Sequence, residues 1–317
     1  MQDLLAAARI AVNDCMGVKA GESVLIIADE PTSLVARALW QAAAEAEAEA
    51  VYMEIVPRPN DGVEPPDTVA EAMVFADVVL AATSRSLSHT DARKEASKAG
   101  VRIASLPGIT ADMMQRTLAA DYRQIAKVSE TFAKALTKGS EARLTTPAGT
   151  NLDMSLAGRE GHPDTGINHM PGTFSNLPAG EAYIAPMEGL AEGILVIDGA
   201  MSGVGVVTQP IRMIVEKGFV TKIEGGAEAA ELNELLGRYG RLAYNIAELG
   251  IGTNDKATLT GNVLEDEKVK GTVHVALGNN TGFGGAVQVP VHLDGILIKP
   301  TLVIDGVTVI QDGNHLI

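Results

Sequence analysis

The chain has 317 residues, of which 46% are hydrophobic and only 3% aromatic, and its formal net charge is −15 at pH 7. This length allows one large or two ordinary domains with an aliphatic core. The negative charge argues against nucleic-acid binding, which requires a basic face. Cys15 is the only cysteine, so an internal disulfide and a thiolate metal cluster are both excluded.

The sequence gives no sign of a targeting or membrane-spanning segment. The first ten residues, MQDLLAAARI, lack a basic region followed by a long apolar run. No uninterrupted apolar stretch approaches the ~20 residues that span a bilayer. We therefore expect a soluble cytoplasmic protein that acts on a small molecule or a short peptide, without a membrane or nucleic-acid partner.

The first half of the chain alternates short apolar runs with helical patterns. Runs typical of buried parallel strands lie at 23–28, 51–56, 77–82 and 101–105, and helices are expected at 33–48, from Thr68, and at 92–99. This alternation predicts right-handed βαβ units in a doubly wound, mostly parallel sheet. Neither GxGxxG nor GxxxxGK[ST] follows the first run, so a dinucleotide or P-loop site is not supported.

Polar residues follow the predicted strands, where sheets of this kind bind ligands. They are Asp29, Ser84, Arg85, Ser86 and His89. Loop residues and helix caps have the same composition, and we favour that interpretation.

The second half has a different pattern. A long helix is expected at 113–138, after which strands are joined by tight turns. The predicted hairpins pair 142–146 with 151–156, 212–216 with 220–224, and 301–304 with 307–310, and one helix is expected at 229–239. We therefore predict two domains: an α/β domain at 1–138 and an α+β domain with mainly antiparallel strands at 139–317.

The segment 271–295 suggests a site for a divalent cation. The alternating residues around His274 predict a strand, and His292 and Asp294 are two residues apart, so that they share one face of a strand. An adjacent strand could bring His274 to the same place. Two imidazoles and one carboxylate can bind a divalent cation, but histidines in strands are also often ordinary hydrogen-bonded residues.

Two glutamates lie in unusual surroundings. Glu181 opens a predicted strand, and Glu248 lies in the apolar and glycine-rich segment 245–254. A buried carboxylate must be paired, protonated or metal-bound, because an isolated buried charge is very costly. Each glutamate alone is consistent with a turn or an ion pair, but together with the residues above they complete a five-ligand set with room for two metals.

Four motifs in the second half resemble the M29 aminopeptidases, the thermophilic metalloprotease or aminopeptidase T-like group. They are NLPAGE at 176–181, NIAELGIGTN at 245–254, GTVHVALG at 271–278 and VHLDG at 291–295. The resemblance implies a homodimeric, metal-dependent aminopeptidase-like hydrolase. It also implies two divalent ions (Zn, Co or Mn) held by Glu181, Glu248, His274, His292 and Asp294. In this interpretation Glu248 also moves a proton to the leaving amine.

The chain departs from that family in two respects. It is shorter, and the segment after His274 lacks the tyrosine that the aminopeptidases carry there. Only Tyr183 or Tyr244 could replace that tyrosine, depending on how the chain folds. These departures affect the prediction of peptide cleavage more than the prediction of metal binding.

A second interpretation comes from the same superfamily, whose 2,5-dihydroxypyridine ring-cleaving dioxygenases are similar in the closing His, His and Asp. His274, His292 and Asp294 would suffice as the facial triad of a mononuclear non-haem Fe(II) oxygenase. His162 or His169 could contribute further polar groups to such a site. A third interpretation is a non-catalytic, ligand-binding member of the family.

Overall fold

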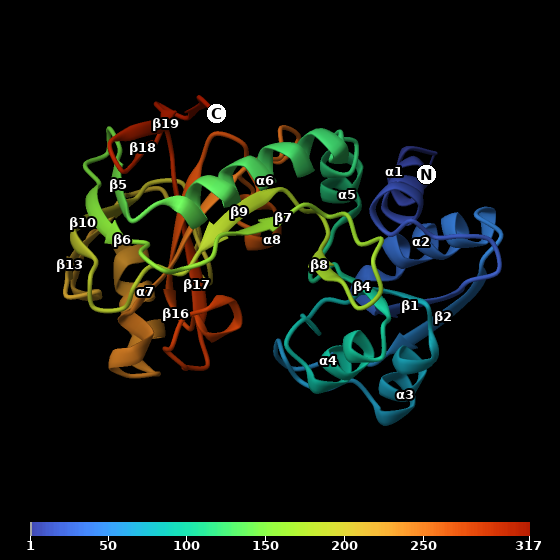
Figure 1. Ribbon diagram of the computed structural model, residues 1–317. Coiled ribbons are helices and arrows are strands. Elements are labelled where there is room, and N and C mark those ends of the chain that lie inside the picture. The colour runs from blue at the N-terminus through green and yellow to red at the C-terminus, as the bar shows by residue number, and fades with distance from the viewer. Residues whose placement is uncertain (1) are drawn as a thin grey trace. The chain divides into compact units, whose positions relative to one another are not determined.

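The computed structural model describes residues 2–317, which group into two compact units (Figure 1). One unit comprises the chain up to Ala126 together with Thr165–Ala179, and the other comprises Lys127–Asp164 and Gly180–Ile317. The predicted fold class is confirmed, because the first unit is α/β with a parallel sheet and the second contains antiparallel sheets. Among residues 2–317, no helix is long and apolar enough to cross a membrane.

The first unit contains a five-stranded sheet in the order β2-β1-β3-β4-β8, with every neighbouring pair parallel. Its strands are β1 (Ser23–Asp29), β2 (Glu49–Ile55), β3 (Val78–Ala82), β4 (Arg102–Ser105) and β8 (Phe174–Asn176). Its helices are α1 (Gln2–Arg9), α2 (Ser33–Glu45), α3 (Asp67–Phe75), α4 (Asp91–Lys98) and α5 (Ala111–Thr117). In Figure 1, α1 and α2 cover one face of this sheet and α3 and α4 the other. All residues of β3 are buried, as the continuous apolar run predicts.

Two features of this region differ from the prediction. The strand β8 was not expected, because three residues of sequence FSN carry no strand pattern. The single helix expected at 113–138 is wrong: α5 ends at Thr117, and α6 (Tyr122–Lys138) begins anew. The break is stabilised by the Asp121 carboxylate, which accepts hydrogen bonds from the backbone N–H groups of Arg123 and Gln124.

The polar residues after β1 and β3 bond to one another. The Asp29 carboxylate accepts hydrogen bonds from the Ser84 backbone N–H at 2.8 Å and from the Thr32 hydroxyl at 2.8 Å. Asp29 is also buried. These contacts fit the interpretation of the segment as loop and capping residues.

The second unit contains two antiparallel sheets. The eight-stranded sheet has the order β14-β13-β10-β6-β5-β18-β19-β20. Its strands are β5 (Glu141–Thr145), β6 (Asn151–Ser155), β10 (Glu192–Ile197), β13 (Ile211–Glu216), β14 (Phe219–Glu224), β18 (Thr301–Ile304), β19 (Val307–Gln311) and β20 (Asn314–His315). The three predicted hairpins are confirmed as β5–β6, β13–β14 and β18–β19.

The seven-stranded sheet has the order β12-β11-β17-β16-β15-β9-β7. Its strands are β7 (His162–Asp164), β9 (Glu181–Ile184), β11 (Ala200–Met201), β12 (Gly205–Val206), β15 (Ile246–Gly252), β16 (Val273–Gly278) and β17 (His292–Leu297). Helices α7 (Ala227–Gly237) and α8 (Val263–Asp266) complete the unit.

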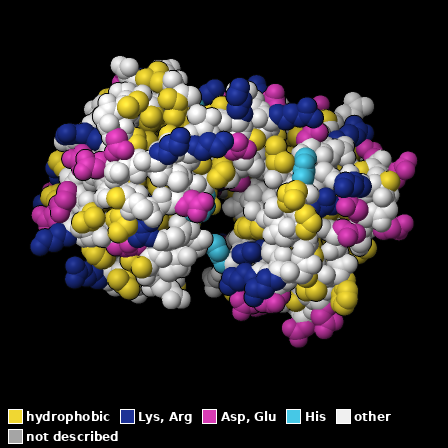
Figure 2. All heavy atoms as spheres, in the orientation of Figure 1, with side chains coloured by type: hydrophobic (Ala, Val, Ile, Leu, Met, Phe, Trp, Pro, Cys, Tyr) yellow, Lys and Arg dark blue, Asp and Glu magenta, His cyan; other side chains and the backbone are white. Residues whose placement is uncertain are grey.

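On the face of the molecule drawn in Figure 2, acidic and basic side chains are interspersed.

The core of the second unit is one aliphatic cluster to which both sheets contribute. The seven-stranded sheet supplies alternate residues of its strands, including Ile184, Leu249, Val275 and Leu293. Because successive strand residues point to opposite faces, the residues between them project from the other face of the sheet. That second face carries the polar residues of the candidate site.

Candidate metal centre

All five predicted ligands lie on the second face of the seven-stranded sheet. Glu248 on β15 pairs with Ala276 on β16, which in turn pairs with Asp294 on β17. His274 and His292 lie two residues away from this row, on β16 and β17, and therefore point to the same face. Glu181 on β9 pairs with Gly252, four residues beyond Glu248 on β15, and shares the face as well.

The side chains meet at short distances. His274 Nε2 lies 3.1 Å from Glu248 Oε1 and 3.3 Å from Glu181 Oε2. His292 Nε2 lies 3.4 Å from Glu248 Oε2 and 3.3 Å from Asp294 Oδ1. Two groups of three have ligand atoms within 4.8 Å of one another: Glu181–Glu248–His274 and Glu248–His292–Asp294. Glu248 belongs to both, and its carboxylate links His274 to the second group.

The centre is buried except at one member. The side chain of His274 is 0% exposed and those of the three carboxylates are below 10% exposed, whereas that of His292 is 31% exposed. Buried carboxylates require compensating positive charge. Because the carboxylates surround them closely, the pKa values of His274 and His292 are raised well above 6.5, although burial by itself lowers them.

The glutamate shared by both groups stays ionised. Burial raises the pKa of Glu248, but hydrogen bonds from His274 and His292 outweigh it and lower that pKa to about 2. Glu248 therefore carries a negative charge at neutral pH between two imidazoles.

The orientation of His292 suits a metal ligand. Its Nδ1 lies 2.7 Å from the backbone carbonyl oxygen of Asn279, so Nδ1–H donates to that oxygen. This bond fixes the ring so that, once the imidazole is neutral, the Nε2 lone pair is directed toward Glu248 and Asp294. The donor set and the fixed ring orientation fit a divalent cation.

Gly250 makes room for the other histidine. It pairs with His274 across β15 and β16, and a Cβ atom at Gly250 would lie 1.9 Å from His274 Nε2. The imidazole therefore occupies the space above a residue without a side chain. Gly250 lies in the motif that carries Glu248, but no sequence pattern marks it as a neighbour of His274.

A buried lysine was also missed. Lys268 Nζ lies 2.5 Å from Glu181 Oε1, 2.7 Å from Glu267 Oε1 and 3.3 Å from Asp164 Oδ2, and its side chain is 1% exposed. The local sequence EDEK resembles a solvated charged surface, so the composition around Lys268 gives no signal of burial.

Aromatic rings extend from the exposed side of the centre. The Phe283 ring lies edge-on to the His292 ring at 5.9 Å and to the Tyr183 ring at 5.4 Å, between ring centroids. His162 continues the row, 5.5 Å from Tyr183. His169 lies elsewhere in the fold, where its Nε2 is 2.8 Å from the backbone oxygen of Asp14.

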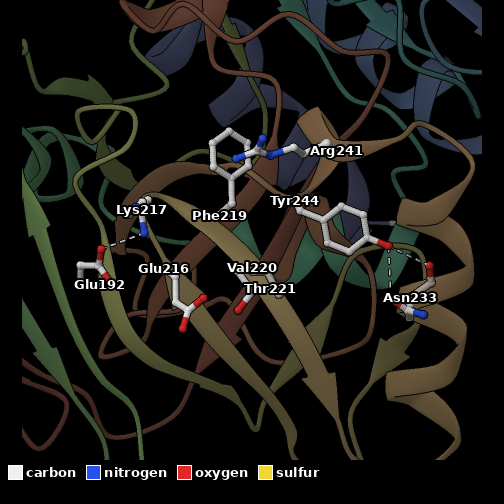
Figure 3. A pocket seen from close by; sticks show the side chains of 9 residues that line it. All are labelled: Glu192, Glu216, Lys217, Phe219, Val220, Thr221, Asn233, Arg241 and Tyr244. Carbon is white, nitrogen blue, oxygen red and sulfur yellow. Dashed lines mark hydrogen bonds between the residues drawn. The ribbon is translucent and has the colours of Figure 1, made fainter.

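The two tyrosines considered from the sequence lie in different places. Tyr183 is on β9, on the same face as Glu181. Tyr244 lines a separate hollow of about 860 Å³, where its hydroxyl contacts Asn233 (Figure 3). In that hollow Arg241 lies over the Phe219 ring, and none of the five predicted ligands contributes to its lining.

Cation binding is expected to release protons. A histidine must be neutral to coordinate a metal, and the raised pKa values mean that His274 and His292 are protonated near pH 7 without a metal. Affinity should therefore rise with pH from 6.5 until the folded-state pKa values are passed, and about two protons should leave per ion near pH 7. Calorimetric titration in buffers of different ionisation enthalpy measures the number of protons released per ion. Uptake without proton release would contradict imidazole coordination.

The comparisons with known proteins cover almost the whole chain. The family model described as NicX, 2,5-dihydroxypyridine 5,6-dioxygenase, matches residues 3–316. A protein named 2,5-dihydroxypyridine 5,6-dioxygenase from Pseudomonas putida KT2440 is 26% identical over 264 residues, which cover 77% of this chain and 72% of the relative.

Two solved structures share the fold. The structure of 2,5-dihydroxypyridine dioxygenase from Pseudomonas putida KT2440 matches with a TM-score of 0.85 and 21% identity, over 98% of this chain and 96% of that one. Wild-type AmpT from Thermus thermophilus matches with a TM-score of 0.74 and 17% identity, over 100% of this chain and 99% of that one. At these identities the likeness shows the fold alone.

The predicted aminopeptidase-like amide hydrolase is wrong, because the family match over residues 3–316 is to a ring-cleaving dioxygenase. The predicted resemblance to the aminopeptidase T-like group holds for the fold, which AmpT shares. The motifs behind that prediction form parts of β9, β15, β16 and β17. They reflect a fold that this chain shares with AmpT, and they do not identify the reaction. The described side chains supply ligands for a divalent cation, while the count of two ions stays a prediction. The chain belongs to the NicX family, that of 2,5-dihydroxypyridine 5,6-dioxygenase.

Proposed function

We propose that this protein is a mononuclear, Fe(II)-dependent dioxygenase that opens the ring of 2,5-dihydroxypyridine or a closely related dihydroxylated pyridine. The observation that carries the proposal is that His274 and His292 face the two oxygens of one carboxylate, that of Glu248, in a chain that matches the dioxygenase family over residues 3–316. The substrate class is taken from the relative in Pseudomonas putida, a 2,5-dihydroxypyridine 5,6-dioxygenase.

The residues that would hold the ion are His274, His292 and Asp294. Two histidines and one carboxylate are the ligand set of many non-haem Fe(II) oxygenases, and they leave coordination positions open. A ferrous ion bound there would supply the one-electron chemistry that lets O₂ react with a closed-shell aromatic ring. The reaction itself balances without an external reductant, because the C5–C6 bond breaks and each of the two carbons receives one oxygen atom of O₂.

Glu248 is the group best placed to orient a ring hydroxyl. It is ionised at neutral pH, since its pKa is lowered to about 2 by the hydrogen bonds from His274 and His292. A carboxylate with so low a pKa is too weak a base to keep a proton, but it accepts a hydrogen bond. We assign Glu248 the role of accepting the hydrogen bond of a ring hydroxyl that approaches the centre.

The aromatic row positions the substrate ring. Tyr183 and Phe283 present ring faces and edges beside His292, the one partly exposed member of the centre. A flat heterocycle gains both apolar burial and edge-to-face contact against such a surface. The Phe283 loop is held in place by Glu188, whose carboxylate accepts hydrogen bonds from Asn280 Nδ2 at 2.9 Å and from the Ala286 backbone N–H at 2.7 Å.

The test is anaerobic reconstitution with Fe(II), Mn(II) or Zn(II), followed by addition of 2,5-dihydroxypyridine and O₂. The iron form should consume one O₂ per ring opened and place both atoms of ¹⁸O₂ in the product. The zinc form should be inactive, because zinc has no redox chemistry. Hydroxypyridines with a single hydroxyl group are the matched substrate control. An iron-loaded protein that consumes no O₂ with any dihydroxypyridine would overturn the proposal.

A further inference from the structure

The Lys268 side chain brings a fixed positive charge into the centre. Its ammonium group is buried and lies within 3.3 Å of three carboxylates, those of Glu181, Glu267 and Asp164. These residues come from β9, the end of α8 and β7, so the folded sheet assembles the cluster. A buried ammonium is stable only with such compensation.

Lys268 affects the two ligand groups differently. In the group Glu181–Glu248–His274, one oxygen of Glu181 is already 2.5 Å from the lysine nitrogen. A divalent ion bound to Glu181 would therefore lie close to a positive charge, in a buried setting where repulsion is poorly screened.

Among the described residues, the carboxylates of the other group form no ion pair with Lys268. In the part of the chain that the structure describes, the ion-pair partners of Glu248 and Asp294 are the two histidines alone. A cation bound by His292 and Asp294 therefore shares no ligand with the ammonium group of Lys268.

We propose that the ammonium group of Lys268 takes the place of a second metal ion, so that the centre holds one divalent cation. In this arrangement one oxygen of Glu181 stays on Lys268, and the other lies 3.3 Å from His274 Nε2. The inference rests on the proposed metal centre but not on the identity of the substrate.

The decisive variant is Lys268→Met, which keeps an unbranched side chain one atom shorter and removes its charge. Metal per chain is measured by elemental mass spectrometry after incubation with excess Mn²⁺ and dialysis, and by calorimetric titration with Mn²⁺. The wild-type protein should hold one ion and the variant two. Lys270→Met is the matched control, because Lys270 lies two residues further along and is exposed, and it should still hold one ion.

A second substitution separates the charge effect from damage to the fold. The double variant Lys268→Met/Glu181→Gln also lacks the Glu181 carboxylate, which would be a ligand of the second ion. The number of Mn²⁺ ions per chain should therefore return to one. Because Lys268→Met alone leaves buried carboxylates without a cation, Mn²⁺ should raise its Tm more than it raises the wild-type Tm.

The possible failures are distinguishable. A folded Lys268→Met protein that holds one ion, or one that stays unfolded even in saturating Mn²⁺, would overturn the role of Lys268. A wild-type protein that binds no cation would instead overturn the proposed metal centre and the function built on it.

Discussion

Replacing His292 with alanine is expected to remove the bound cation and abolish ring cleavage. His292 contributes the one imidazole that faces Glu248 and Asp294 while its Nδ1 is held by the Asn279 carbonyl oxygen. Loss of an outer hydrogen-bond partner of a ligand typically lowers metal affinity roughly 10–100-fold, so loss of the ligand itself should exceed that range. Iron per chain and the rate of O₂ uptake measure the effect.

The fold should survive this substitution, because the His292 side chain is 31% exposed and supports no apolar core. Its thermal unfolding without metal therefore serves as the check on folding. His169→Gln is the matched control, since the His169 ring bonds to the Asp14 carbonyl oxygen and does not belong to the centre. A His292→Ala protein with full iron content and wild-type kcat/KM would rule out His292 as a ligand.

The sequence could predict the row of ligands because strand periodicity is local. His292 and Asp294 are two residues apart, which is enough to place them on one face of any strand. His274 lies beside them because its strand, β16, pairs antiparallel with β17. Glu181 and Glu248 joined the set as carboxylates in unusual surroundings and through the family resemblance, and the pairing of β9 with β15 places them on the same face.

The cluster around Lys268 could not be predicted in this way. Its three carboxylates come from positions 164, 181 and 267, and two of them belong to strands at the far edge of the sheet. Asp164 lies in β7, whose three residues HPD carry no strand pattern. Only the register of β7 with β9 brings Asp164 opposite Glu181.

The parallel sheet of the first unit was predictable for a similar local reason, except at its edge. Continuous apolar runs indicate central parallel strands, whereas β8 is short, polar and paired on one side only.

The reaction could not be deduced from the ligands, because hydrolases and oxygenases both use histidine and carboxylate donors. The family match over the whole chain was needed to decide between them.

Replacing Gly250 with alanine is expected to damage the metal centre through a single added methyl group. The backbone of Gly250 does not have a positive φ angle, so alanine fits the local conformation. The added Cβ, however, would lie 1.9 Å from His274 Nε2, far inside van der Waals contact. The imidazole must therefore move away from Glu248. We expect cation affinity to fall roughly 10–100-fold and overpacking to destabilise the fold by about 1–3 kcal/mol.

The measurement is the Kd for Mn²⁺ by calorimetric titration, at a temperature where thermal unfolding shows the variant fully folded. Gly237→Ala is the matched control, because a Cβ there would meet only the Tyr244 hydroxyl oxygen at 3.8 Å, an ordinary contact. Its affinity for Mn²⁺ should be unchanged. If Gly250→Ala binds Mn²⁺ as tightly as the wild-type protein, then His274 is not a ligand. The cation would then depend on the compact group of Glu248, His292 and Asp294 alone.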